Sequence, residues 1–308
     1  SPLDEITPGL SWLNPFGAGG AALSSGLLLG VFAYWGWESA VNLNEETTDS
    51  KDTPGKAAIV STLLLLVTYV GTAIAVICYA GPTFLEDNAG DEEQIFAVLA
   101  DQAMGGWSWI VLLAVATSAI ASTQTTIIPA SRTALSMARR GALPAVFGRI
   151  SPQHRTPSVS TWVVAAIATV WFVGLSLISE NALYDSLTAL SLLIAFYYAL
   201  TGLACAIYYR RHLLDDVKSF LLIGLGPVVG AVLLVWLLVI SVIDMSDPAN
   251  AYGGQSWFGL GPPLVIGIVL FGLGLVFTIA SRLSGSRYWS ERPGVVPDTA
   301  LAEHEERT

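Results

Sequence analysis

Six long stretches of this chain contain no charged residue, and they constrain its fold more than any other feature. Each holds the roughly 20 apolar residues that a helix needs to cross the hydrocarbon core of a bilayer. They cover residues 57–80, 102–131, 156–179, 186–209, 219–243 and 248–281. Only 12% of the residues are charged, whereas a soluble domain has about 25%. The sequence therefore predicts an all-α integral membrane protein and excludes an ordinary soluble domain.

A seventh apolar segment differs from the other six because it contains an acid. Residues 26–47 read GLLLGVFAYWGWESAVNLNEET, with Glu38 near the middle. A carboxylate in hydrocarbon costs roughly 2.5–3.5 kcal/mol even on a lenient scale, so it usually marks a pathway or a binding site. The glycines and aromatic residues just before it form a sequence in which a helix can open. The alternative is that Glu38 bonds to a neighbouring helix and only fixes packing.

The lysines and arginines lie on one side of the predicted membrane. Counted along the chain, residues 26–47 are the first predicted span and the run 248–281 is the seventh. All 14 lysines and arginines follow the first, third, fifth or seventh span. The stretch 1–20 and the connections near 81–101, 180–185 and 244–256 contain none. Because these residues concentrate in cytoplasmic loops, we expect a multi-pass protein of the plasma (inner) membrane, with residue 1 outside and the C-terminus in the cytoplasm.

Few residues suggest chemistry other than binding. Cys78 and Cys205 fall near opposite ends of their spans, so we expect no disulfide. The three histidines lie in loops or the tail without metal-ligand spacing, and no constellation of an enzyme is found at membrane depth. The net charge of −10 comes mostly from acids in the loops and the tail, so it indicates no nucleic-acid partner. We expect no metal, no cofactor and no enzymatic activity.

The third span is predicted to continue past the membrane. Its helical pattern runs beyond Arg132 toward Pro144, with Gly141 as a stop signal. A short helix over residues 145–150 is expected in the connection that follows. The residues from 284 onward are polar and contain proline, so disorder is predicted there.

Two motifs resemble the amino acid-polyamine-organocation (APC) superfamily of permeases. The run YWGWESA at residues 34–40, followed by an acid-rich turn and Pro-Gly at 54–55, looks like the sixth transmembrane helix of that family. The run SRTALSMARRGALPAVFGRISPQHRTPSVS at residues 131–160 is similar to the end of its eighth helix and the loop into the ninth. The two motifs occur in the order and topology of the family, and the resemblance covers nearly the whole chain.

The resemblance implies a seven-helix part of a leucine-transporter-type fold. That fold is a five-plus-five inverted repeat whose first and sixth helices are unwound near the midplane. Residues 21–210 would form the second repeat, with the first helix broken near 33–37, and residues 211–283 the two additional helices. Residues 1–20 would be an extracellular lead, and 284–308 a cytoplasmic tail. The departure from the family is that the five helices of the first repeat are absent, so half of the expected substrate site is not in this chain.

The resemblance also assigns roles around the break. Ala33, Tyr34, Trp35 and Gly36 would supply unwound backbone to the substrate, and Phe32 would be the aromatic lid. Freed carbonyls can accept hydrogen bonds from an ammonium group, and nearby amides can bind a carboxylate. Glu38 would begin the second half-helix and hold the local network or accept a proton. For Trp35 and Trp37, lipid-facing or core positions remain as an equal alternative.

A polar stripe in the third span is the second candidate wall of the site. Ser122, Thr126 and Pro129 lie three to four residues apart, hence on about one face of a helix. Ser122 and Thr126 could contact the substrate side chain. Alternatively, such hydroxyls bond to carbonyls of their own helix or join helices, which is the commoner case. In the fifth span, Ser191, Tyr197 and Tyr198 are expected to serve helix packing.

These observations favour a secondary active transporter of amino acids or related amines that works by alternating access. H⁺, Na⁺ or an exchanged solute would drive it as a symporter or antiporter, with the lipid bilayer as its environment. The alternative is a non-transporting membrane protein or scaffold that needs an N-terminal half for activity. The sequence does not determine the substrate or the oligomeric state.

Overall fold

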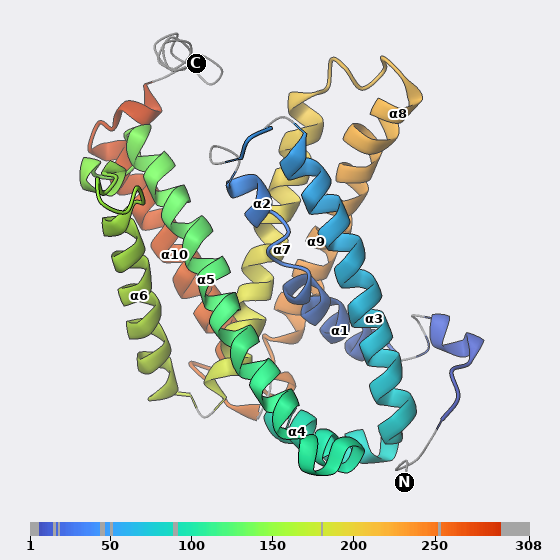
Figure 1. Ribbon diagram of the computed structural model, residues 1–308. Helices are drawn as coiled ribbons and strands as arrows, with labels where there is room; N and C mark the ends of the chain where they lie inside the picture. The colour runs from blue at the N-terminus through green and yellow to red at the C-terminus, as the bar shows by residue number, and fades with distance from the viewer. Residues whose placement is uncertain are drawn as a thin grey trace. The chain divides into compact units, whose positions relative to one another are not determined.

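The described part of the chain is helical throughout. The computed structural model describes residues 6–14, 17, 19–43, 47–49, 52–88, 92–179, 181–251 and 254–290. Within these ranges the only extended pairing is a single bridge between Trp257 and Leu260. This agrees with the predicted all-α class (Figure 1).

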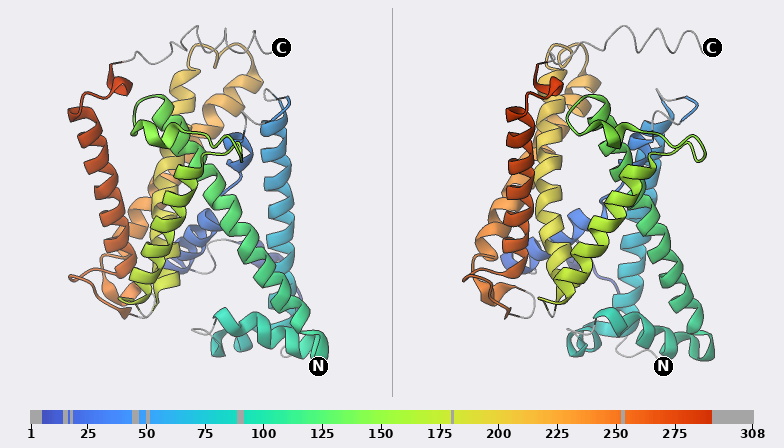
Figure 2. Two further views of the ribbon diagram at one scale, coloured as in Figure 1. Left: turned by 60° about the vertical axis from the view of Figure 1, so that its left-hand side comes forward. Right: turned by 90° about the vertical axis from the view of Figure 1, so that its left-hand side faces the viewer.

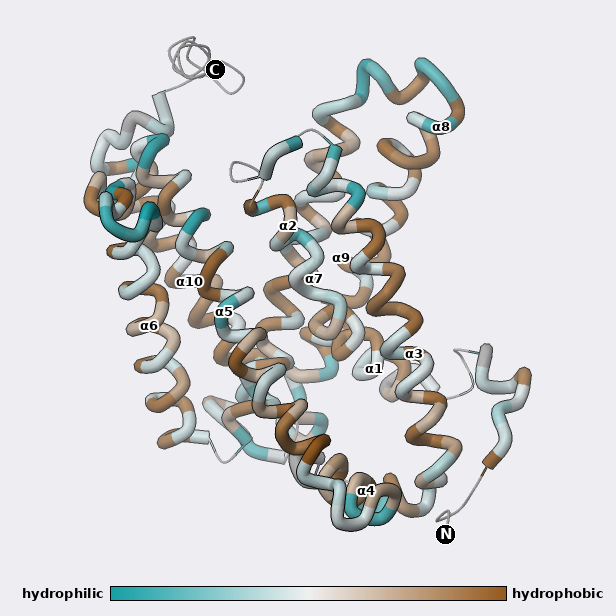
Figure 3. Tube along the Cα trace, in the orientation of Figure 1, coloured by the Kyte–Doolittle hydropathy of each residue, from teal (hydrophilic) through white to brown (hydrophobic). Residues whose placement is uncertain are grey.

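Six helical stretches are long and apolar enough to cross a membrane. They are α3 (Thr53–Asp87), α5 (Trp109–Arg139), α6 (Ser158–Ser176), α7 (Ala182–Tyr208), the combined stretch Val217–Asp244 and α10 (Pro262–Leu283). The combined stretch consists of α8 (Val217–Ser219), the π-helical η5 (Phe220–Leu225) and α9 (Gly226–Asp244). Pro227, which lacks a backbone N–H, follows directly after the π-helical residues and accounts for the local change of hydrogen bonding. Apolar residues dominate these stretches, whereas the connection from α7 to α8 is hydrophilic (Figure 3).

The predicted first span, residues 26–47, is not a continuous helix. It consists of α1 (Gly20–Ala33), five turn residues and the short α2 (Ser39–Asn42). At the centre of the turn, Gly36 has φ +109°, a conformation that residues with a Cβ rarely adopt. The count of span-length helices is therefore six, plus one interrupted segment.

The predicted limits of two other spans differ from the observed ones. The charge-free run 248–281 was expected to contain a span, and its start overlaps the expected connection near 244–256. In the structure, α10 begins only at Pro262, after η6 (Pro248–Asn250) and a tight turn at Phe258 and Gly259. Adjacent prolines fit the first turn of a helix, where no N–H is needed, but not its interior. Conversely, α3 runs on to Asp87, with a kink where Gly81 has φ +76° before Pro82.

The third predicted span follows its expected course. α5 extends past Arg132 to Arg139, and Gly141 has φ +76°, as a helix-terminating glycine does. The short helix expected in the next connection is the 3₁₀ turn η4 (Ala145–Gly148). Further short elements are η1 (Leu10–Leu13), α4 (Glu92–Met104) and η3 (Gly105–Trp107). Of these, η1 lies in the predicted lead.

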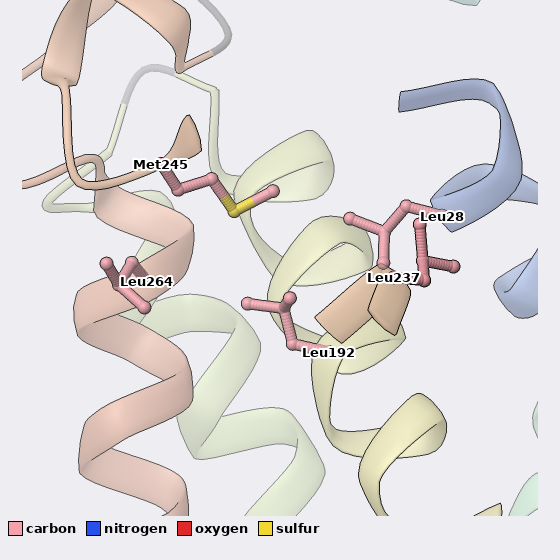
Figure 4. Packing of buried hydrophobic residues seen from close by; sticks show 5 residues of the cluster. All are labelled: Leu28, Leu192, Leu237, Met245 and Leu264. Atoms are coloured by element: carbon pink, nitrogen blue, oxygen red, sulfur yellow. The ribbon is translucent and has the colours of Figure 1, made fainter. Parts of the chain in front are cut away.

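The chain divides into two compact units. The first comprises Ser1–Thr126 and Phe172–Ile268, and the second Ile127–Trp171 and Val269–Thr308. In the first unit, α7 packs along α9, and α1 packs against both; the two views of Figure 2 show α7 and α9 side by side. The apolar core of this unit consists of Leu28, Leu192, Leu237, Met245 and Leu264 (Figure 4).

Close approach of α7 and α9 depends on a glycine. A Cβ added at Gly202 of α7 would lie 2.9 Å from the carbonyl oxygen of Pro227, which is too close for real atoms. Buried serines on these helices, Ser191 and Ser241, are similarly small. Small residues at such contacts are typical of helices that pack within membranes.

In the second unit, the beginning of the predicted tail differs from the prediction. Residues 284–290 were expected to be disordered, but they include the 3₁₀ turn η8 (Arg287–Trp289). The Ser286 hydroxyl donates to the carbonyl of Gly141, and the Ser281 hydroxyl donates to that of Ala142 at 3.4 Å. The rest of the predicted tail, residues 291–308, lies outside the described residues.

Candidate functional site

The break between α1 and α2 leaves backbone groups available for a ligand. The last helical bonds are from Tyr34 N–H to the Gly30 carbonyl and from Trp35 N–H to the Phe32 carbonyl, at 3.0 and 2.9 Å. The carbonyls of Ala33, Tyr34 and Trp35 accept no hydrogen bond from any residue that the structure describes. Nor do the N–H groups of Trp37 and Glu38 donate to any residue in those ranges. The break therefore presents both acceptors and donors.

Glu38 accepts hydrogen bonds from two elements. The hydroxyl of Tyr197 donates to its Oε1 at 2.6 Å, and the hydroxyl of Tyr198 donates to its Oε2 at 2.7 Å. The N–H of Gly36 also donates to Oε2, at 3.2 Å. Both tyrosines belong to α7, so the carboxylate connects the break to a helix about 160 residues later in the chain. Three donors thus satisfy both oxygens of the carboxylate.

Trp35 extends this network by one step. Its indole N–H donates to the Tyr197 oxygen at 2.8 Å, and that tyrosine in turn donates to Glu38. Both side chains are partly buried. Trp35 is therefore hydrogen bonded to α7, and its role in substrate binding stays a prediction.

Two consecutive tyrosines reach one carboxylate because it lies between them. Neighbouring residues of a helix point in directions about 100° apart, so they seldom share a partner. Here the two rings contact each other edge to face, with centroids 4.5 Å apart, and both hydroxyls converge on Glu38. Helix packing was the expected role of Tyr197 and Tyr198. A buried phenol needs a hydrogen-bond partner, and this was the signal in the sequence that could have linked them to the acid.

The remaining aromatic residues of the break have ring neighbours. The Phe32 ring lies 6.3 Å from that of Trp35, and the Tyr34 ring meets Tyr69 of α3 edge to face at 5.5 Å. Trp37 lies 6.0 Å from Tyr198 and is 39% exposed. The lid role of Phe32 stays a prediction, since these contacts do not assign it.

The polar stripe of α5 shows a different bonding pattern. The hydroxyl of Thr126 donates to the carbonyl of Ser122 at 2.9 Å, within the same helix. Thr123 and Thr125 do the same with Ala119 and Ala121, at 2.9 and 3.1 Å. Ser122 and Thr126 are exposed in this structure, and neither forms a described hydrogen bond with the break or with Glu38. The structure thus joins Trp35 and Glu38 to α7, but no described hydrogen bond joins the stripe to them.

Other candidate chemistry is limited in the described part. Cys78 and Cys205 are free thiols. No group of three or more His, Cys, Asp or Glu side chains suitable for a metal ion occurs among the described residues.

The comparison with known protein families decides the assignment. The model of the amino acid permease family matches residues 2–278. The chain belongs to this family. Its members are transporters rather than enzymes, which confirms both the resemblance noted in the sequence and the expectation that the chain is not an enzyme.

Individual relatives agree with the family. The chain is 28% identical to the human Asc-type amino acid transporter 1 over 269 residues, covering 86% of this chain and 46% of that protein. It is 27% identical to an uncharacterized transporter of Mycobacterium tuberculosis, over 73% of this chain and 48% of the relative. The chain thus spans less than half the length of these curated relatives. No solved structure gives a significant match.

Proposed function

We propose that this permease-family chain contributes one wall of the substrate site of a secondary active transporter for amino acids or related amines. The observation that carries the proposal is the break at residues 34–38, where free backbone groups lie beside a carboxylate that is bonded to α7. The human relative, whose name describes it as an amino acid transporter, supports the substrate class.

The backbone groups of the break match the two charged ends of an amino acid. Carbonyls at Ala33, Tyr34 and Trp35 can accept from an ammonium group, which is a donor only. The free N–H groups of Trp37 and Glu38 can donate to a carboxylate. Interrupted helices hold substrates in this way in transporters built from inverted repeats. We assign these backbone groups, with Phe32 as the lid, to substrate binding.

The Glu38 network is suited to act as a gate between α7 and the break. In the ionised state the carboxylate accepts from both tyrosines. When Glu38 takes up a proton, one oxygen becomes a donor, and the acceptor capacity for the two phenols falls. Loss of either phenol bond loosens the connection to α7. Protonation, substrate binding or both would thereby favour a second conformation, as alternating access requires.

Uptake of radiolabelled amino acids into proteoliposomes tests this proposal. A purified preparation that contains this chain should accumulate an amino acid or a related amine, and Glu38→Gln should abolish or reduce the uptake and flatten its pH dependence. Imposed H⁺ and Na⁺ gradients, applied separately, identify the driving ion. If Glu38→Gln leaves both the rate and its pH profile unchanged, the gating role is wrong.

A second candidate function is that of a non-transporting membrane protein or scaffold, which needs an N-terminal half for activity. The support for it is the coverage of the relatives, which contain more than twice the length matched here. Co-expression with an N-terminal half from a relative distinguishes the two cases. Uptake by the chain alone contradicts the scaffold, whereas uptake only after complementation shows that the facing wall of the site lies outside this sequence.

We further propose a location in the plasma (inner) membrane, with the connection between α9 and α10 outside and that between α5 and α6 inside. The one-sided distribution of lysine and arginine supports this orientation. In a background of Cys78→Ser and Cys205→Ser, a single cysteine at Ser256 should react with a membrane-impermeant thiol reagent added to intact cells. A single cysteine at His154 should react only after the membrane is opened. The reverse pattern would overturn the orientation.

A further inference from the structure

Asp185 is an acid buried inside the first structural unit, away from the candidate site. It lies in the first turn of α7 and is 0% exposed. Its Oδ2 accepts from the hydroxyl of Ser179 at 2.5 Å, and Ser179 is itself only 4% exposed. Its Oδ1 is buried and has no hydrogen-bond partner in the part of the chain that the structure describes. Glu38, in contrast, has both oxygens bonded.

No lysine or arginine is found on the described elements that pack most closely against α7. Among the elements that pack against α7, neither α1, η5 nor α9 contains a lysine or arginine, and none occurs anywhere in residues 219–281. The titratable groups that α9 and its following turn carry at this end are acids, Asp244 and Asp247. Tyr184 precedes Asp185 in the helix, and Glu180 lies outside the described residues. The described elements that pack most closely against α7 therefore offer Asp185 no lysine or arginine as a partner.

The surroundings of Asp185 are apolar on the side that faces the core. Residues 185, 189 and 192 are spaced so that they share one face of α7. Ala189 is fully buried, and Leu192 belongs to the apolar cluster with Met245 and Leu264 (Figure 4). Burying an ionised carboxylate with a single neutral donor is far more costly than burying a neutral acid. The partial positive charge at a helix N-terminus offsets only a small part of that cost.

We propose that Asp185 is a proton-binding site, which holds its proton at neutral pH in this conformation and releases it when water reaches its carboxyl group. In the neutral acid, the proton on Oδ2 is donated to the Ser179 oxygen across the same short O–O distance. Oδ1, the atom without a described partner, is then the oxygen of a neutral carbonyl group and does not share a negative charge. On hydration, the O–H bond of the acid breaks, the proton passes to water and the carboxylate remains.

This site is separate from Glu38 although both act on α7. Asp185 precedes Tyr197 by twelve residues, which corresponds to about 18 Å along a helix. Asp185 therefore lies in the first turn of α7, whereas Glu38 is bonded to residues in the middle of that helix. The inference does not rest on the proposed transport function, because it concerns the protonation state of one side chain.

Infrared spectroscopy of the purified chain in lipid nanodiscs tests the site directly. At neutral pH we expect a carbonyl stretching band of a protonated carboxylic acid that is lost in Asp185→Asn and kept in Glu38→Gln. Asparagine has nearly the same shape and no proton to lose, so the variant should fold. If wild type and Asp185→Asn show the same spectrum in this region at neutral pH, the proposal is wrong.

A second variant keeps the test decisive if Asp185→Asn does not fold. Ser179→Ala leaves the acid in place but removes its one hydrogen-bond partner. A neutral Asp185 should then show its carboxylic band shifted to higher frequency, because the acid is no longer hydrogen bonded. An ionised Asp185 would show no such band, and only its carboxylate bands would change. The first result supports the proton-binding site, and the second overturns it.

Discussion

The break at residues 34–38 and the hydroxyl stripe of α5 were both predicted to line the substrate site, yet their polar groups are satisfied in opposite ways. Glu38 and Trp35 form hydrogen bonds to Tyr197 and Tyr198, on a helix distant in the sequence. Thr126, like its threonine neighbours, donates to a carbonyl one turn earlier in its own helix. One region depends on tertiary structure, and the other is self-contained.

The difference follows from the chemistry of the side chains. A hydroxyl can reach the carbonyl four residues earlier, so a spanning helix can carry serine and threonine without any partner. A carboxylate is an acceptor only, and a helix interior offers it no free donors. An acid inside a span therefore forces the fold to bring donors to it. Removing the acid should have far larger consequences than removing a hydroxyl.

The largest effect is expected for Glu38→Ala. Three hydrogen bonds to the carboxylate disappear, and the two phenols of α7 lose their acceptor. We expect the free energy of unfolding to fall by about 2–4 kcal/mol, measured by denaturant titration in detergent micelles. Glu38→Gln should lose less, because its amide oxygen still accepts from one tyrosine.

A matched control for the acid is Glu86→Ala. Glu86 lies exposed in the last turn of α3, where substitutions usually change stability by less than about 0.5 kcal/mol. Equal effects of Glu38→Ala and Glu86→Ala would mean that the Glu38 network contributes nothing to stability.

The second prediction separates the two tyrosines. Tyr197→Phe removes two hydrogen bonds, the one to Glu38 and the one from Trp35, whereas Tyr198→Phe removes one. We expect losses of about 2 and about 1 kcal/mol respectively. In the Glu38→Gln background each loss should shrink, with a coupling energy of about 1 kcal/mol in a double-mutant cycle. Additive effects would show that the tyrosines are held by ring packing and not by the acid.

The sequence predicted most of the fold because the apolar runs are long and glycines mark where helices end or are interrupted. Gly141 ends α5 where expected, and the acid-bearing segment is interrupted beside Gly36. The start of α10 could not be read from the absence of charge, because the charge-free run 248–281 also includes η6 and the turn at Phe258 and Gly259. Absence of charge measures compatibility with lipid, and it does not distinguish a helix from an apolar loop.

Only one part of the candidate site, the break with Glu38, was predicted from the sequence. Glu38 was evident from its position, but its partners were not, because consecutive residues of α7 converge on one carboxylate. Such convergence depends on how α1 and α7 pack, which no local pattern contains. Asp185 was missed for a related reason. It borders an apolar run and resembles a loop acid, and its burial becomes evident only from the packing of the α6–α7 turn.

The third prediction concerns the geometry of the break itself. Gly36→Ala should lower the free energy of unfolding by about 1–2 kcal/mol, because alanine is strained at φ +109° even though there is space for its Cβ. Gly30→Ala is the control: Gly30 lies in α1 with equally open surroundings and a helical backbone. It should stabilise the chain by up to about 1 kcal/mol. If both substitutions are neutral, the turn at Gly36 is not a fixed part of the structure.

The smallest effect is expected in the stripe of α5, and it tests whether a self-contained region can still be functional. Thr126→Val and Ser122→Ala should each change the free energy of unfolding by less than about 0.5 kcal/mol, because both positions are exposed. Thr117→Val, whose hydroxyl also bonds within α5, controls for general effects on the helix. The informative measurement is the relative uptake of small and large amino acids by a transport-competent preparation. If Thr126→Val or Ser122→Ala alters that ratio while Thr117→Val does not, the stripe contacts the substrate, although it contributes nothing to stability. If all three variants keep the wild-type ratio, the hydroxyls only satisfy their own helix, and selectivity depends on the break.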